Sequence, residues 1–289
     1  MIKRELKNRH FYHIVNNSPW PLLISFTLLG LTSGTMFWFH QNVIYIFFLS
    51  FCTMIYIMFL WFRDVIREGT FEGNHTKEVQ SNLKFGMFLF ILSEVMFFFS
   101  FFWTFFHSSL APSWEIGIVW PPIDIVVLDT WRVPALNTII SLTSGAAITW
   151  AHYALILGKR YEVIQGFCIT IFLAILFTLF QMMEYFSSLY HLYDGIYGSI
   201  FFIITGFHGL HVLIGTCFLL ICFFRFLKFH FTSNHHIGFQ SASWYWHFVD
   251  VIWILLFISV YFWGNFFDAS EIIEYSYSFI KNEIFSIKR

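Results

Sequence analysis

Long apolar stretches, separated by short polar or Gly- and Pro-containing breaks, set the pattern of this chain. About 20 consecutive apolar residues form a helix long enough to cross the hydrocarbon core of a bilayer. The breaks after the first, fourth and fifth stretches are short, so we expect these neighbours to form antiparallel helix hairpins. The pattern predicts an all-α, polytopic membrane protein with seven transmembrane helices. Their predicted residues are 22–39, 43–62, 83–106, 133–157, 161–186, 197–224 and 239–263.

Two polar segments lie outside this helical pattern. Residues 107–132 carry Ala-Pro at 111–112 and Pro-Pro at 121–122, which favours an ordered loop outside the membrane. Residues 265–289 are acidic and amphipathic, as expected of a surface tail or a segment that contacts a partner. The expected organisation is a seven-helix membrane domain over residues 1–264, followed by a C-terminal extension.

Composition agrees with a membrane protein and excludes several other classes. Hydrophobic residues make up 58% of the 289 residues and charged residues 11%, too few to cover a water-facing surface. A net charge of −1 lacks the basic excess of a nucleic-acid-binding protein. The four cysteines form no CxxC pair, so we expect neither a disulfide framework nor a zinc site, but small apolar core residues. They are Cys52, Cys168, Cys217 and Cys222.

The basic residues predict the orientation of the chain. Of the 16 Lys and Arg residues, 12 fall on the side of the membrane that holds the N-terminus. Short loops rich in Lys and Arg stay on the inner side, so the N-terminus is expected inside. Seven spans then place the C-terminus outside.

Acidic residues within the apolar stretches are the first candidates for function, because a carboxylate in a membrane is costly. Glu94 lies at the middle of the third stretch and must be protonated or have a partner on a neighbouring helix. One interpretation is a neutral Glu that joins two helices by a hydrogen bond, and the other is a role in a proton, lipid or gas pathway. Asp250 in the seventh stretch has His247 three residues earlier, which favours a structural intrahelical pair. Glu184, near the outer end of the fifth stretch, is expected at the interface.

The 13 histidines do not show a pattern for a redox cofactor. No two of them have the spacing of about 13–14 residues that a diheme helix bundle requires. His208 and His211 share a helical face, but no Cys or Met partner stands at matched spacing. We therefore expect no redox cofactor, no metal and no catalytic residue in this chain.

Basic side chains gather just outside the predicted inner ends of the helices. Such clusters commonly hold anionic lipid headgroups, and the simpler interpretation is positive-inside topology alone. The charged and histidine side chains of these clusters are Arg63, Asp64, Arg67, Glu68, His75, Arg225, Lys228, His230, His235 and His236.

Several sequence strings together resemble subunit III of the aa3-type cytochrome c oxidases of mitochondria and aerobic bacteria. They occur in the family's order and spacing over about residues 10–264. They include SPWP at 18–21, WFRDVIREGTFEGNHT at 61–76, ILSEVMFFFSFFW at 91–103, HSSLAPSWEIG at 107–117, SGAAITWAHYAL at 144–155, YGSIFFIITGFHGLHVLIG at 197–215, FFRFLKFHFTSNHHIGF at 223–239 and WYWHFVDVIWILLF at 244–257.

The resemblance implies a fold and a set of partners. The first two helices are expected to be splayed from helices 3–7 around a lipid-filled cleft. The chain itself would carry no cofactor beyond bound phospholipids such as cardiolipin, while haem a and copper would lie in partner subunits. The implied partners are cytochrome c oxidase subunits I and II and accessory subunits. Residues 265–289 extend past the usual end of the family, and we expect this extension to dock a lineage-specific accessory subunit on the outer side. The implied location is the mitochondrial inner membrane, rather than a bacterial plasma membrane, with the N-terminus in the matrix and the C-terminus in the intermembrane space.

The resemblance also implies a function and roles for particular residues. The chain would be a non-catalytic core subunit of respiratory complex IV that supports electron transfer from cytochrome c to oxygen coupled to proton pumping. The family acid that matches Glu94 reacts with carbodiimides and is linked to proton uptake and to protection from inactivation during turnover. The alternative is a stand-alone seven-helix transporter or channel with Glu94 and Asp250 as a proton relay. The residues that match the family's lipid contacts are Trp61, Arg63, Arg67, Glu68, His75, His211, Arg225 and Lys228.

Overall fold

The computed structural model describes residues 11–122 and 125–264, and within these ranges the regular structure is entirely helical. Seven of the helices are long and apolar enough to cross a membrane, which confirms the predicted fold class. The chain divides into two compact units, which meet between Phe85 and Gly86 inside the third helix. The elements are α1 (Trp20–Gln41), α2 (Tyr45–Thr70), α3 (Lys77–Leu110), η1 (Trp114–Ile116), α4 (Val133–Ile156), α5 (Arg160–Ser187), α6 (Gly195–Leu227), α7 (Ile237–Leu256) and a π-helical segment, η2 (Phe257–Trp263).

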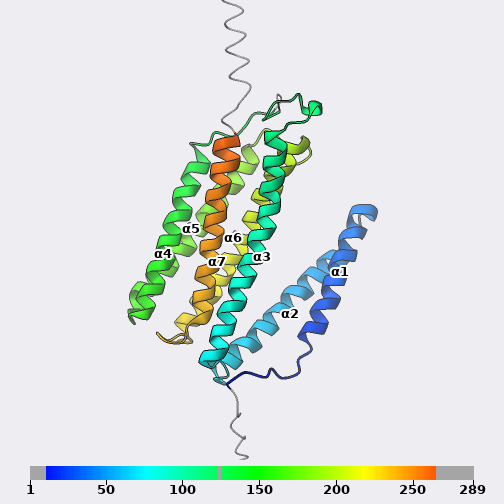
Figure 1. The fold of residues 1–289 in the computed structure, drawn as a ribbon. Coiled ribbons are helices and arrows are strands. Elements are labelled where there is room, and N and C mark those ends of the chain that lie inside the picture. The colour runs from blue at the N-terminus through cyan, green and yellow to red at the C-terminus, as the bar shows by residue number, and fades with distance from the viewer. Residues whose placement is uncertain (1–10, 123–124, 265–289) are drawn as a thin grey trace, which may run out of the picture. The chain divides into compact units, whose positions relative to one another are not determined.

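The N-terminal unit, described from residue 11 to residue 85, is built on the antiparallel hairpin of α1 and α2 (Figure 1). The Trp20 indole N–H at the start of α1 donates to Asp64 Oδ2 near the end of α2, at 2.8 Å. Arg63 donates to the other oxygen of Asp64, at 2.9 Å. This bonding joins the open end of the hairpin, because a half-buried carboxylate that accepts several hydrogen bonds fixes the elements that supply them.

The C-terminal unit, described from residue 86 to residue 264 apart from residues 123–124, packs α4, α5, α6, α7 and the later part of α3 side by side (Figure 1). Thr170 on α5 donates to the Ser144 carbonyl of α4, at 3.5 Å, as expected for an antiparallel hairpin. Trp253 of α7 is fully buried and meets the Phe177 ring of α5 edge to face. Aromatic rings and small residues thus supply the packing that joins helices where water does not drive association.

Side-chain hydrogen bonds connect α4 to α7 at successive turns. Ser141 Oγ donates to Asp250, while the Trp246 and Trp253 indole N–H groups donate to Ser144 and Thr138, at 2.8, 2.9 and 3.1 Å. The α4 partners are spaced three residues apart, so they lie on one face of the helix. Polar side chains at such positions join membrane helices, because without a partner on the neighbouring helix they would be left without a hydrogen bond in hydrocarbon.

All seven predicted stretches are helices, but several helices extend beyond the predicted ends. Helix α2 continues to Thr70, and α3 runs from Lys77 to Leu110. The apolar pattern marks only the part of a helix that lies in hydrocarbon, so the polar turns that extend it were not predicted. Helix α3 covers residues 107–110 of the expected loop at 107–132, and the later described residues of this loop hold one short helical turn, η1.

The cysteines are not all core residues, because Cys52, Cys168 and Cys217 are exposed on their helices and only Cys222 is buried. A cysteine in an apolar run is equally suited to a lipid-facing position, so the run alone did not decide its burial. The 265–289 extension lies outside the described residues, and the splay of the first two helices stays a prediction.

Candidate functional site

An acid and a histidine meet within the membrane-spanning part of the C-terminal unit. Glu94 Oε2 of α3 lies 2.9 Å from His211 Nε2 of α6. The Glu94 side chain is 23% exposed and the His211 side chain 10%, so neither is an ordinary solvated group. Of the two options that the sequence left open, protonation or a partner on a neighbouring helix, the structure supplies a partner, His211.

The other ring nitrogen of His211 restricts the protonation states of this pair. Nδ1 lies 2.7 Å from the Phe207 carbonyl oxygen, which can only accept a hydrogen bond, so Nδ1 carries a proton. Nε2 then either accepts a hydrogen bond from a neutral Glu94 or, as part of an imidazolium, donates a hydrogen bond to the Glu94 carboxylate. One proton is shared between Glu94 and Nε2 in both cases, and the pair has no net charge. This neutrality lowers the cost of placing two titratable groups in a membrane.

Aromatic rings surround the imidazole of this Glu94–His211 pair. The Phe98 ring of α3 lies edge-on to it with ring centres 5.0 Å apart, and the Tyr245 ring of α7 stacks on it at 6.3 Å. Phe248 contributes a third ring at 6.2 Å. Because α3 and α7 supply these rings and α6 carries the imidazole, the orientation of His211 depends on the packing of the three helices together.

A second acid lies where α4 meets α7. Asp250 is 8% exposed, and its Oδ1 accepts the 2.8 Å hydrogen bond from Ser141 Oγ. Its Oδ2 has no hydrogen-bond partner among the described residues and points toward Gly145. A Cβ at Gly145 would lie 2.6 Å from Oδ2, so the missing side chain makes room for the carboxyl group.

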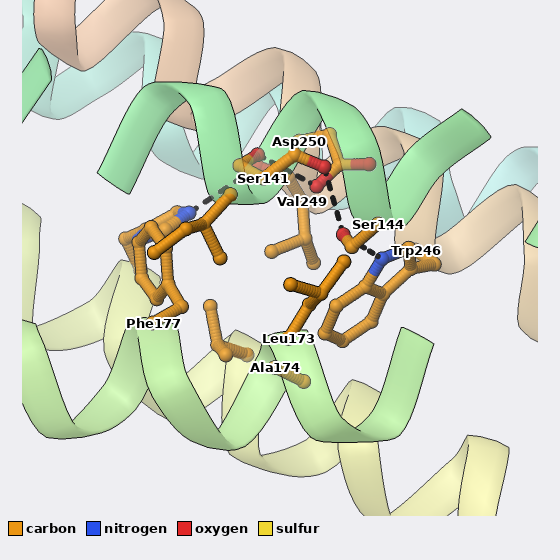
Figure 2. Close-up of a pocket in the computed structure, with 11 residues that line it drawn as sticks. Ser141, Ser144, Leu173, Ala174, Phe177, Trp246, Val249 and Asp250 are labelled. Atoms are coloured by element: carbon orange, nitrogen blue, oxygen red, sulfur yellow. Dashed lines mark hydrogen bonds between the residues drawn. The ribbon is translucent and has the colours of Figure 1, made fainter. Parts of the chain in front are cut away.

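Figure 2 shows a small cavity beside this acid, lined by Ser141, Ser144, Trp246 and Asp250 on its polar side and by Leu173, Ala174, Phe177 and Val249 on its apolar side. His208 also lines it and lies 3.2 Å from the Val249 carbonyl through Nε2. The cavity has room for about one water molecule, and its hydroxyl and carboxyl groups supply the polar contacts that such a water requires.

The expected pair of His247 and Asp250 is wrong. His247 Nε2 instead lies 3.1 Å from Thr149 Oγ1 of α4. The Thr149 hydroxyl already donates to the Gly145 carbonyl, so it accepts from the His247 ring. The spacing places His247 and Asp250 on the same face of α7. Each of them nevertheless bonds to a hydroxyl group of α4, His247 to Thr149 and Asp250 to Ser141.

Glu184 is the acid that the sequence placed incorrectly. We expected it at the interface, but it is 2% exposed within the last turn of α5. It lies in a buried polar region together with Gln181 and Tyr261. The error arose because distance from the end of an apolar stretch does not reveal which face of a helix packs against its neighbours.

The predicted lipid contacts of the N-terminal unit lie at the end of α2 and just beyond it. Arg67 is exposed, while Trp61, Arg63, Glu68 and His75 are half-buried. Arg63 is engaged by Asp64, with a shortest contact of 2.9 Å. This group therefore offers an exposed guanidinium beside partly buried polar groups, which is a suitable surface for an anionic headgroup.

The predicted lipid contacts of the C-terminal unit do not all lie together. Arg225 and Lys228 lie at the end of α6, with the Arg225 guanidinium 4.4 Å from the centre of the Phe231 ring. His211 is 14 residues earlier, about 21 Å along the helix, and contacts Glu94 instead. The pKa of His230, just beyond α6, is lowered by partial burial and by the positive charges of Arg225 and Lys228.

The fold and these sites define a class: a polytopic, all-helical membrane protein with paired acids between its helices. The sequence model described as "Cytochrome c oxidase subunit III" matches residues 10–265. Proteins named cytochrome c oxidase subunit 3 from Mammuthus primigenius, Loxodonta africana and Raphicerus melanotis are each 55% identical over 256 residues, which cover 89% of this chain and 98% of each relative. The chain belongs to the cytochrome c oxidase subunit III family.

Proposed function

We propose that this chain is a non-catalytic core subunit of cytochrome c oxidase in the mitochondrial inner membrane, with its N-terminus in the matrix. The observation that carries the proposal is the family match over residues 10–265, which spans the seven described membrane helices. Subunits I and II would hold haem a and copper, and accessory subunits would complete the complex. This chain would support electron transfer from cytochrome c to oxygen and the coupled proton pumping by stabilising the catalytic subunit.

Purification of the chain from its native membrane tests this proposal. A tag on the chain should recover a complex that contains haem a, copper and the catalytic subunits. The alternative, a stand-alone proton-linked transporter or channel, requires the chain to purify without haem a and to move protons when reconstituted alone. Such a result would replace the proposal.

The Glu94–His211 pair supports a role in proton uptake. Glu94 Oε2 and His211 Nε2 lie 2.9 Å apart, so a proton can pass from one side chain to the other without a change in the net charge of the pair. Asp250, bonded to Ser141 beside a cavity of about one water, is the second intramembrane acid. We assign Glu94 to proton-linked support of the catalytic subunit and Asp250 to the joining of α4 and α7.

The basic helix ends support phospholipid binding, with cardiolipin as a suitable anionic ligand. In the N-terminal unit the groups are Trp61, Arg63, Arg67, Glu68 and His75, and in the C-terminal unit they are Arg225 and Lys228. Each positive side chain near an anionic membrane surface contributes about 1 kcal/mol of attraction. Lipid held there would keep the complex intact during turnover.

A further inference from the structure

We propose that His13, Glu68 and His75 bind a divalent metal ion of the zinc class. Each of these three residues offers one ligand atom, and the three atoms lie within 4.8 Å of one another. All three residues belong to the N-terminal unit and are half-buried, so an ion can reach them from water. The proposal goes beyond the proposed function of the chain, although Glu68 and His75 also belong to the proposed lipid contacts.

The end of α2 and the turn after it place Glu68 beside His75. The Asn74 N–H donates to the Glu68 carbonyl, at 3.0 Å, which folds the turn back onto the last turn of α2. The Gln80 side chain donates to the His75 carbonyl, at 2.9 Å, and holds the backbone of this histidine from the other side. Gly69 is also required, because a Cβ there would lie 2.6 Å from His75 Nδ1.

The segment before α1 brings His13 to the same place. The Thr76 hydroxyl donates to the Phe11 carbonyl and so attaches this segment to the turn that contains His75. The His13 and His75 rings have centres 6.1 Å apart and planes inclined at 57°. Two segments that are distant in sequence thus meet, one supplying His13 and the other supplying Glu68 and His75, and hydrogen bonds that do not involve the ligand atoms hold them in place.

The donor set selects the kind of metal. Two imidazoles and one carboxylate are the three protein ligands of open four-coordinate zinc sites, in which water or another ligand takes the fourth position. Calcium and magnesium instead prefer oxygen ligands. Tetrahedral ligands about 2.0–2.1 Å from zinc lie about 3.3 Å apart. The side chains must therefore move inward by about an ångström when an ion binds, which half-buried side chains can do.

The charges near the site favour moderate affinity. The two neutral imidazoles and the Glu68 carboxylate leave a bound divalent ion with one net positive charge. Arg67 precedes Glu68 on α2 and is exposed, so its charge opposes the ion only through screened interaction. Glu68 and His75 also belong to the proposed lipid contacts, and a phosphate oxygen is a suitable fourth ligand.

Zinc binding to the purified complex, after removal of metals from exposed sites with a chelator, tests the proposal. Equilibrium dialysis against Zn²⁺ should give one more bound ion per copy of this chain in the wild type than in His13→Gln. Glu68→Gln should weaken binding at this site at least about 10-fold, because loss of a ligand costs no less than loss of an outer-shell partner. His40→Gln, which removes an exposed histidine of the same unit, is the matched control and should bind as the wild type does.

Two results would overturn the proposal. One is identical zinc binding by the wild type, His13→Gln and Glu68→Gln. The other is displacement of the ion by a modest excess of Ca²⁺ or Mg²⁺, which would show an oxygen-ligand site rather than this donor set. Zinc-edge X-ray absorption should show imidazole nitrogen scattering in the wild type that His13→Gln reduces. His13 lies outside the helices, so this variant should keep its haem a content and its thermal unfolding midpoint.

Discussion

Glu94 of α3 and His211 of α6 lie 2.9 Å apart, and the second nitrogen of the same imidazole faces the Phe207 carbonyl. This arrangement allows one proton between the two side chains and keeps the pair neutral in either position of that proton. A carboxyl group in this environment is therefore both a connection between two helices and a group that can exchange a proton. The two interpretations of Glu94 that the sequence left open are compatible with one structure.

Replacement of Glu94 should separate these two roles. In Glu94→Gln the amide N–H can donate to His211 Nε2, so we expect normal assembly and a loss of stability below about 1 kcal/mol, but no shared proton. In Glu94→Ala the imidazole loses its partner and the loss should be larger, about 1–3 kcal/mol. Unfolding of the complex in detergent, compared across both variants, measures the difference. Loss of assembled oxidase in the Gln variant would show that the carboxyl group is required for structure.

A double-mutant cycle tests the contact itself. Glu94→Ala and His211→Ala should be less than additive, with a coupling free energy of about 0.5–1.5 kcal/mol, the range of hydrogen bonds between membrane helices. The matched pair Ser141→Ala and His211→Ala removes groups that do not contact each other and should be additive. Equal coupling in both cycles would mean that the Glu94–His211 bond has no stabilising effect.

Gly145→Ala should displace Asp250. The new Cβ would lie 2.6 Å from Asp250 Oδ2, which forces the carboxyl group away from Ser141 and should cost about 1–3 kcal/mol. Gly209→Ala is the control, because no atom lies within 4 Å of its added Cβ and Ala is the better helix former. Thermal unfolding midpoints should fall for the first variant only. In an Asp250→Ala background the effect of Gly145→Ala should disappear, and its persistence there would place the clash elsewhere.

Acidification should destabilise the segment around His230. Partial burial and the charges of Arg225 and Lys228 lower the pKa of His230, so the folded state binds its proton less readily than the unfolded state. The stabilising contribution is then complete above the ordinary pKa of about 6.5 and is lost as the pH falls through the lower folded value. The unfolding midpoint of the wild type should fall more steeply between pH 7 and 5 than that of His230→Gln. Equal slopes, or a gain in stability on acidification, would contradict the sign of this effect.

Loss of positive charge at the end of α6 should release phospholipid. Lys228→Gln should lower the amount of phospholipid retained per complex and shorten the time for which the complex stays active during continuous turnover. Arg225→Gln should have the same two effects. Native mass spectrometry and lipid phosphorus content measure the first effect. Lys159→Gln is the control, since this lysine is paired with Glu162 at 2.9 Å and is not among the proposed contacts. Unaltered lipid content in Lys228→Gln and Arg225→Gln would remove the assignment.

The sequence predicted the fold because apolar length is a direct requirement of the bilayer. All seven stretches are helices, and only their polar ends were missed, as at Thr70 and Lys77. The position of Glu94 at the centre of a span predicted that it is either protonated or has a partner on a neighbouring helix, but it did not identify that partner. His211 could not be chosen over other histidines without knowledge of how α3 meets α6, which depends on the packing of aromatic rings on both helices.

Local spacing gave wrong or incomplete results where partners come from another helix. It paired His247 with Asp250, whereas Thr149 and Ser141 of α4 are the actual partners. The run of hydroxyl residues on one face of α4, at Thr138, Ser141 and Ser144, was the signal that could have indicated a polar contact with α7. The approach of His13 to Glu68 had no such signal, because the contact joins segments that are far apart in the chain and follows no periodic pattern.

The most direct test of the account is to prepare the oxidase with and without this chain and to follow both during continuous turnover. If the chain is a non-catalytic supporting subunit, the depleted complex should keep its haem a and copper and begin with substantial oxygen reduction. It should then lose activity faster than the complete complex, and addition of the purified chain with phospholipid should restore the longer lifetime. Loss of haem a or copper together with the chain, or equal lifetimes with and without it, would contradict the account.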